Sequence, residues 1–145
     1  KDNYPFQLPL HAAFHTPLLE SISRKAFGLL PKSIFQKPLV ALVDGRGHIW
    51  SPFSTETEEL YNYTLGHQVT NAYDFSTSIT VSMKEFCPDK LVLLGPGNSL
   101  GGAIGQIMIN NNWLDINSKK AFSSRQKKDP YLISMGMKDQ RELVC

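Results

Sequence analysis

Two short apolar runs, each stopped by a glycine turn, constrain the fold of this chain more than any other feature. The run 39–43 (LVALV) ends at an Asp-Gly turn, and the run 90–94 (KLVLL) ends at the loop 95–98 (GPGN). Apolar runs without polar alternation are typical of strands that are buried on both faces. Because segments with helical periodicity follow both runs, the sequence predicts an α/β fold with a parallel sheet.

Helical periodicity and end signals predict the other elements. Thr16 followed by Pro17 predicts a helix start, with the threonine hydroxyl as cap and the proline at the first helical position. The segments expected to be helical are 17–29, 56–66, 74–86, 99–110 and a short polar stretch after Trp113. In the helix 99–110 one face should be apolar, and a last strand is expected over 131–135.

Size and composition exclude several classes of protein. The chain has 145 residues, 41% hydrophobic and 19% charged, with a net charge of +2. This charge is too small to indicate nucleic acid or an anionic membrane as the main partner, and no run approaches the ~20 apolar residues of a membrane span. Cys87 and Cys145 lie far apart, so we expect reduced, unpaired thiols in a cytoplasmic protein.

The loop 95–98 and the helix after it can be interpreted in several ways. As a dinucleotide fingerprint it lacks the third glycine, and as a phosphate-binding P-loop it has Ala103 and Ile104 where Lys and Ser/Thr are needed. The letters G-N-S-L-G around Ser99 match the G-x-S-x-G elbow of serine hydrolases, but no histidine follows His67. A glycine loop that lets a helix pack closely on a sheet is the simpler interpretation.

The loop 11–17 (HAAFHTP) carries two histidines four residues apart. Flanking prolines argue against the helix that a metal-binding pair would need, and Ala12 replaces the glutamate of the H-E-x-x-H motif, so no metal site is expected. A histidine on a loop before a helix is a candidate general base, since its ordinary pKa lies near neutral pH. A hydrogen-bonded structural histidine is the alternative.

Four segments in order resemble the malonyl-CoA:acyl carrier protein transacylases, a family that includes the acyltransferase domains of fatty acid and polyketide synthases. The segments are 8–19 (LPLHAAFHTPLL), 38–45 (PLVALVDG), 66–71 (GHQVTN, continuing to Phe75 and Ser78) and 94–100 (LGPGNSL). The first is similar to the family's histidine motif and the last to its Gly-Pro-Gly loop. After Trp113 the chain carries no motif of the family.

This resemblance implies a two-step acyl transfer. A serine takes the malonyl group from malonyl-CoA and passes it to the phosphopantetheine thiol of acyl carrier protein, with no cofactor of its own. By resemblance His15 is the general base, and the backbone carbonyl of Gln68 orients its ring in place of a carboxylate. Phe14 matches the bulky residue of malonyl-selective members, with core packing as the alternative. The remaining substrate-binding residues implied by the resemblance are Gly95, Gly97 and Asn98.

The family's nucleophile motif, Gly-His-Ser-x-Gly, does not occur in these residues. The chain also opens at Lys1 rather than at Met, so we expect a piece of a longer protein. On the family template, residues 1–7 leave a missing ferredoxin-like subdomain. Residues 8–145 then form the C-terminal part of an α/β-hydrolase-like acyltransferase core, with a short parallel sheet flanked by helices. The missing N-terminal part of the same protein is accordingly expected to be a binding partner of these residues.

Two other functions remain open on the sequence. A serine hydrolase or esterase would use Ser99 within this chain, and an active-site serine probe should then label it. A non-catalytic fragment that binds acyl carrier protein would bind without acyl transfer.

Overall fold

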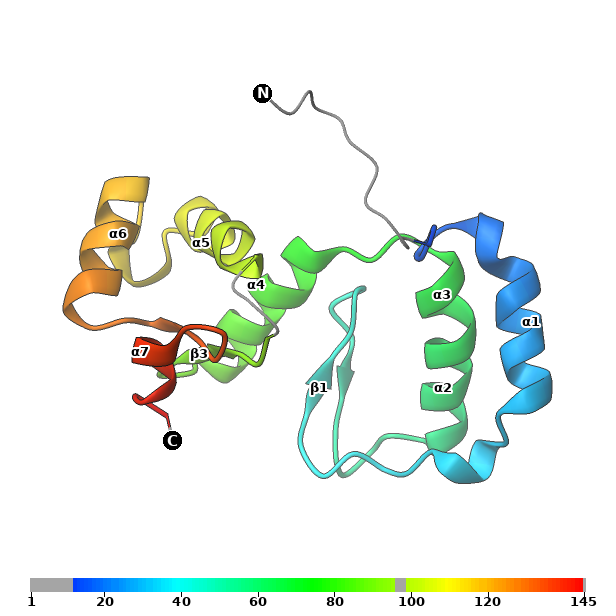
Figure 1. Ribbon diagram of the computed structural model, residues 1–145. Coiled ribbons are helices and arrows are strands. Elements are labelled where there is room, and N and C mark those ends of the chain that lie inside the picture. The colour runs from blue at the N-terminus through cyan, green and yellow to red at the C-terminus, as the bar shows by residue number, and fades with distance from the viewer. Residues whose placement is uncertain (1–11, 96–98, 145) are drawn as a thin grey trace. The chain divides into compact units, whose positions relative to one another are not determined.

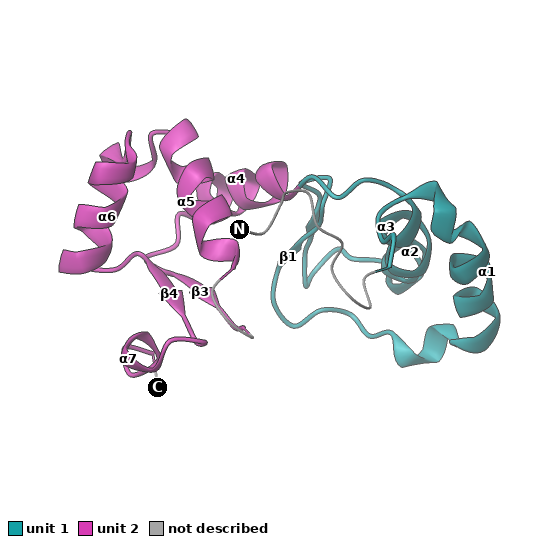
Figure 2. Ribbon diagram, turned by 45° about the horizontal axis from the view of Figure 1, so that its top comes forward, with its two compact units in different colours: residues 1–74 teal, residues 75–145 magenta. Residues whose placement is uncertain are grey.

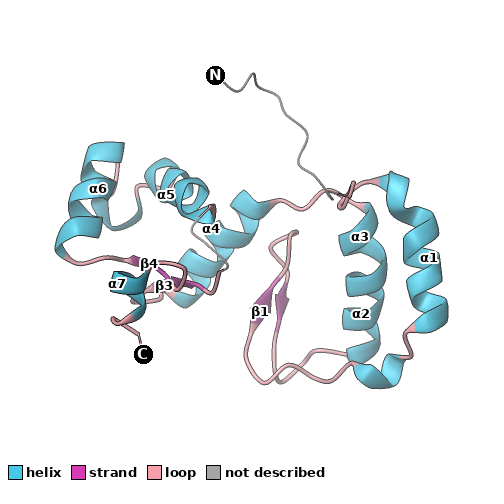
Figure 3. Ribbon diagram, viewed as in Figure 1, coloured by secondary structure: helices cyan, strands magenta, loops and turns pink. Residues whose placement is uncertain are grey.

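The computed structural model describes residues 12–95 and 99–144. The chain divides into two compact units, residues 1–74 and residues 75–145 (Figure 2). Each unit combines helices with one two-stranded sheet (Figure 3). The general expectation of a mixed α/β chain is therefore confirmed.

Unit 1 is built around one helical segment that lies between a second helix and a hairpin (Figure 1). Its elements are a 3-10 turn Pro17–Leu19, α1 Glu20–Leu29, a 3-10 turn Lys32–Ile34, β1 Leu42–Val43, β2 Ile49–Trp50, α2 Thr57–Asn62, a π-helical turn Tyr63–His67 and α3 Gln68–Thr70. The hydroxyls of Ser23 and Tyr61 join α1 to this segment, since Ser23 donates to the Leu65 carbonyl and Tyr61 to the Leu30 carbonyl. At Gly66 an added Cβ would lie 3.4 Å from the Phe27 ring, which shows how closely the two helices approach.

The run 39–43 does not form the buried parallel strand that the sequence predicts. Only Leu42 and Val43 pair, and they pair antiparallel with Trp50 and Ile49. Leu39 is 95% exposed. The reason is the turn at Asp44, whose carboxylate accepts the backbone N–H groups of Arg46 and His48 and folds the chain back into a hairpin.

Unit 2 contains the parallel pair that the sequence predicts. Its elements are α4 Phe75–Phe86, β3 Leu91–Leu93, α5 Leu100–Asn110, a 3-10 turn Trp113–Asp115, α6 Lys119–Lys128, β4 Leu132–Ser134 and α7 Lys138–Arg141. Strands β3 and β4 are parallel, with Leu91 opposite Leu132. They lie between α5 and α6 on one side and α7 on the other (Figure 2). Helix α5 and the last strand are thus confirmed.

The hydrophobic core of unit 2 forms where α5 meets α4, α6 and β4. Its buried members are Met83, Ile104, Ile107, Met108, Ile116, Tyr131 and Leu132. The apolar face expected for the helix 99–110 is the face that packs here. Strand β3 is less buried than its apolar sequence suggests, because Val92 at its centre is 42% exposed.

The start of the first helix also differs from the expectation. Pro17 does begin the helical turn, but the Thr16 hydroxyl donates to the Ala13 carbonyl and caps no helical N–H. Within the described ranges, no helix is long and apolar enough to cross a bilayer.

Candidate functional site

His15 has a left-handed backbone conformation. Its φ is 66°, in the left-handed region that residues with a side chain seldom adopt. The backbone N–H of His15 donates to the Val69 carbonyl at 2.9 Å. Strained backbone of this kind persists where the surroundings fix it, and it is concentrated at functional sites.

The His15 ring is held by the end of the neighbouring helix. Its Nδ1 lies 2.5 Å from the backbone carbonyl oxygen of Gln68. Helix α3 ends at Thr70, so the carbonyls of Gln68 and Val69 belong to the last turn, where no intrahelical N–H remains for them. The ring and the backbone N–H of His15 therefore donate to two consecutive carbonyls that have no partner within the helix.

The π-helical turn Tyr63–His67 directly precedes these carbonyls. A π-helical turn inserts one residue into an α-helix and is often found at functional sites. The turn ends at His67, one residue before Gln68, and so adjoins the last turn of the helix, where His15 binds.

The hydrogen bond to Gln68 fixes the chemistry that the ring can perform. A carbonyl oxygen only accepts, so Nδ1 carries the proton in the neutral ring and Nε2 holds the free lone pair. Tyr73 lies against the ring, with the centroids 5.4 Å apart and the planes at 46°. His15 is half-buried, and in the described part of the chain Nε2 has no hydrogen-bond partner. The arrangement suits a general base that acts through Nε2.

The other residues predicted for the site do not all lie near His15. Phe14 is 56% exposed and lies beside the His15 ring, so it is not packed into a core of the described residues. Gly95 follows β3 in unit 2 with φ 100°, a conformation that favours glycine. Gly97 and Asn98 lie outside the described residues. Geometry thus joins His15 to Gln68 and Phe14, while the predicted role of the glycine loop stays a prediction.

Ser99 does not have the backbone of a nucleophile elbow. It precedes α5 with φ −58° and ψ −30°, an ordinary helical conformation, whereas the elbow is a sharp, strained turn. Residues 75–145 contain no histidine that could serve as its base within unit 2. The hydrolase alternative gains no support from this geometry.

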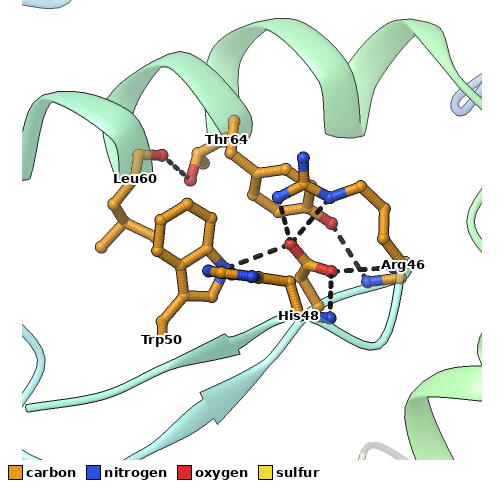
Figure 4. A network of polar contacts seen from close by, with 8 residues as sticks. Arg46, His48, Trp50, Leu60 and Thr64 are labelled. Atoms are coloured by element: carbon orange, nitrogen blue, oxygen red, sulfur yellow. Dashed lines mark hydrogen bonds and ion pairs between the residues drawn. The ribbon is translucent and has the colours of Figure 1, made fainter. Parts of the chain in front are cut away.

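Sequence reasoning missed a polar network centred on Asp44 (Figure 4). Its Oδ2 accepts from Arg46 Nη2 at 2.6 Å, from Arg46 Nε at 3.1 Å and from the Trp50 indole at 3.2 Å. The Tyr63 hydroxyl, from the helix, accepts the Gly45 N–H at 3.1 Å. The letters D-G-R-G between two apolar segments were a hairpin signal that could have located the turn.

The network shifts two ionisation equilibria. Burial would raise the pKa of Asp44, but the hydrogen bonds from the Arg46 side chain and from the N–H groups of Arg46 and His48, with the Arg46 charge, lower it below the ordinary value. Burial raises the pKa of Tyr63, and the Asp44 charge adds to this. Asp44 is therefore a buried, ionised and fully bonded carboxylate at neutral pH.

A pocket of about 170 Å³ adjoins the two residues that contact the His15 ring. Its walls are mainly apolar and aromatic: Leu42, Val43, Asp44, Trp50, Leu60, Tyr63, Thr64, Gln68 and Tyr73. Both Gln68 and Tyr73 also contact His15. The pocket is comparable in size to a cavity of about 150 Å³ that holds one benzene molecule, so it has room for a small organic group.

Among the described residues, no three His, Cys, Asp or Glu side chains gather as a metal ion would require. Comparison of the chain with protein-family models, curated proteins and solved structures finds no match. The geometry around His15 and the sequence resemblance are thus the two observations that bear on function.

Proposed function

We propose that this chain supplies the general base of a serine-dependent acyltransferase, with His15 as the base and malonyl-CoA and acyl carrier protein as donor and acceptor. The observation that carries the proposal is the 2.5 Å contact between His15 Nδ1 and the Gln68 carbonyl. A resemblance in sequence alone would not bring two residues 53 positions apart into hydrogen-bonding distance. The finer fold assignment, an α/β-hydrolase-like core, is part of the same proposal.

In the first half-reaction, Nε2 takes the proton of a serine hydroxyl that a Gly-His-Ser-x-Gly segment outside this chain supplies. The serine oxygen bonds to the thioester carbonyl carbon, and the carbon–sulfur bond then breaks. The leaving thiolate of coenzyme A takes the proton from Nε2, which leaves malonyl-serine and a neutral ring.

In the second half-reaction, Nε2 takes the proton of the phosphopantetheine thiol, whose sulfur attacks the acyl-serine. The serine oxygen leaves and recovers the proton. Throughout, the Gln68 carbonyl holds Nδ1–H and stabilises the imidazolium without adding a full negative charge.

The test uses the polypeptide that joins this chain to its Gly-His-Ser-x-Gly segment. Radiolabelled malonyl-CoA should label the protein and then acyl carrier protein, and His15→Ala should lower transfer at least 100-fold, a typical size for general-base catalysis. Gln68→Ala is the matched control: it keeps the backbone carbonyl and should retain most activity. Transfer that survives in His15→Ala would remove this residue from the mechanism.

A further inference from the structure

A second, larger pocket of unit 1 is separate from the contacts of His15. It measures about 420 Å³, within the range of small-molecule sites. The residues that line it come from the hairpin and from the helical segment: Arg46, His48, Trp50, Glu59, Asn62, Tyr63 and His67. The pocket thus combines aromatic walls with several groups that can form hydrogen bonds.

Arg46 is held rigidly at this pocket. Its Nε and Nη2 donate to the buried carboxylate of Asp44, and its guanidinium carbon lies 4.3 Å from the centroid of the Tyr63 ring. A guanidinium group has five N–H donors, and Asp44 receives two of them. Three donors are left on a planar group whose orientation is already fixed, so little entropy is lost when they bind a ligand.

Asn62 and Glu59 are two further polar side chains of the pocket: the Asn62 amide can donate to a ligand, whereas the Glu59 carboxylate only accepts. Neither Asn62 nor Glu59 forms a side-chain hydrogen bond with another residue in the described ranges, and both are exposed. The His67 ring stacks on Tyr63, with centroids 5.8 Å apart and planes at 26°. The His48 ring packs edge-on against Trp50 at 4.5 Å. Tyr63 and Trp50 are buried, at 7% and 4% exposed, so most of the ring surface left for a ligand belongs to the imidazoles of His48 and His67.

We propose that this pocket binds a small planar carboxylate, whose two oxygens accept from Arg46 and whose flat body lies on the imidazole rings of His48 and His67. An arginine fork matches the geometry of a carboxylate, and such charge-assisted bonds are about twice as strong as neutral ones. Asp44 already offsets the Arg46 charge, so hydrogen-bond geometry and ring contact supply most of the affinity. The proposal does not depend on the acyltransferase function of His15.

Benzoate is the probe, and the indole N–H signal of Trp50 in ¹⁵N–¹H NMR spectra is the reporter. The chain has two tryptophans, so Trp113→Phe assigns the Trp50 signal. Benzoate should move this signal saturably. Benzamide has the same shape but only one acceptor oxygen in place of two, so it should bind roughly tenfold more weakly. Acetate should also bind more weakly, because it has no ring to stack. Equal binding of benzoate and benzamide, or no saturation by benzoate, would overturn the proposal.

Variants test the role of the fork. Arg46→Gln should weaken benzoate binding roughly tenfold. Arg46→Lys should weaken it as well, because lysine has no planar fork. Arg24→Gln on α1 is the matched control and should bind benzoate as the wild type does. Glu59→Gln removes the acid from the pocket wall and should tighten binding. Unchanged affinity in Arg46→Gln, with its NMR spectrum still that of a folded protein, would also overturn the proposal. The benzoate and benzamide comparison needs no variant, so it decides the question even if Arg46→Gln does not fold.

Discussion

Five N–H groups donate to the single carboxylate of Asp44: the backbone N–H groups of Arg46 and His48, two on the Arg46 guanidinium and the Trp50 indole. The carboxylate has about four lone-pair sites, so its acceptor capacity is filled. Its side chain is 3% exposed, and a buried charge is tolerated only when paired and bonded in this way. These bonds hold the turn and join it to β2 through Trp50.

Asp44 should make the stability of unit 1 depend on pH in the acid range. Its pKa in the folded chain lies below the ordinary 3.8, so the folded state favours the ionised form. The stability this provides is present above the unfolded pKa and is lost as pH falls through the folded pKa. In urea unfolding at several pH values, the difference in unfolding free energy between wild type and Asp44→Asn should be largest at pH 6–7 and shrink below about pH 4.

The matched control for this measurement is Glu20→Gln, which neutralises an exposed carboxylate on α1. Its difference from wild type should be small at every pH, as is usual for surface charges. A difference between wild type and Asp44→Asn that stays constant from pH 7 to pH 3 would show that the ionisation of Asp44 does not contribute.

At the level of elements, periodicity predicted the helices better than the strands. The helix 99–110 has an apolar face at helical spacing, and α5 buries Ile104, Ile107 and Met108 as that spacing indicates. The run 39–43 has no such internal evidence of its partner. A short apolar run is compatible with a central strand or with a hairpin arm, and what decides between them is the Asp-Gly-Arg-Gly turn after it, in which Asp44 accepts two backbone N–H groups.

For the candidate site, too, one part could be predicted from the sequence and another part could not. The two histidines of the loop 11–17 mark it as a candidate site by residue type alone, whereas the choice of His15 as base and of the Gln68 carbonyl as its partner follows from the family resemblance. The left-handed backbone of His15 and the ring of Tyr73 beside it could not be predicted, because both depend on how the loop meets the end of α3. Contacts between distant segments leave no periodic signal in a sequence.

Gly102 and Gly105 of α5 allow a prediction about helix packing. A Cβ on Gly102 would meet no atom within 4 Å, whereas one on Gly105 would lie 3.0 Å from the Phe122 ring. Alanine favours a helix over glycine by about 0.5–1 kcal/mol. Gly102→Ala should therefore raise the free energy of unfolding by about that amount, while crowding against Phe122 should cancel or reverse the gain in Gly105→Ala.

Urea unfolding of the two alanine variants, followed by circular dichroism, provides the check. The glycines lie three residues apart in one helix, so the change in helix propensity is matched and the Phe122 contact is the difference. Equal stabilisation by both substitutions would mean that the α6 residue Phe122 yields freely and that α5 and α6 are not closely packed at this point.

At the level of the whole molecule, each of the two units has its own buried residues and its own tryptophan, Trp50 in unit 1 and Trp113 in unit 2. Met108 is fully buried in the core of unit 2, and Leu65 is 8% exposed in unit 1. A buried Leu or Met replaced by alanine costs about 2–5 kcal/mol. If the units are stabilised separately, each substitution should act on its own unit.

The two indole N–H signals report on this directly during urea unfolding. Met108→Ala should move the transition of the Trp113 signal to lower urea and leave the Trp50 transition in place, and Leu65→Ala should do the reverse. Each variant is thus the control for the other. If either substitution moves both signals together, the chain unfolds as one cooperative unit, and the site around His15 then depends on the core of unit 2 for its stability.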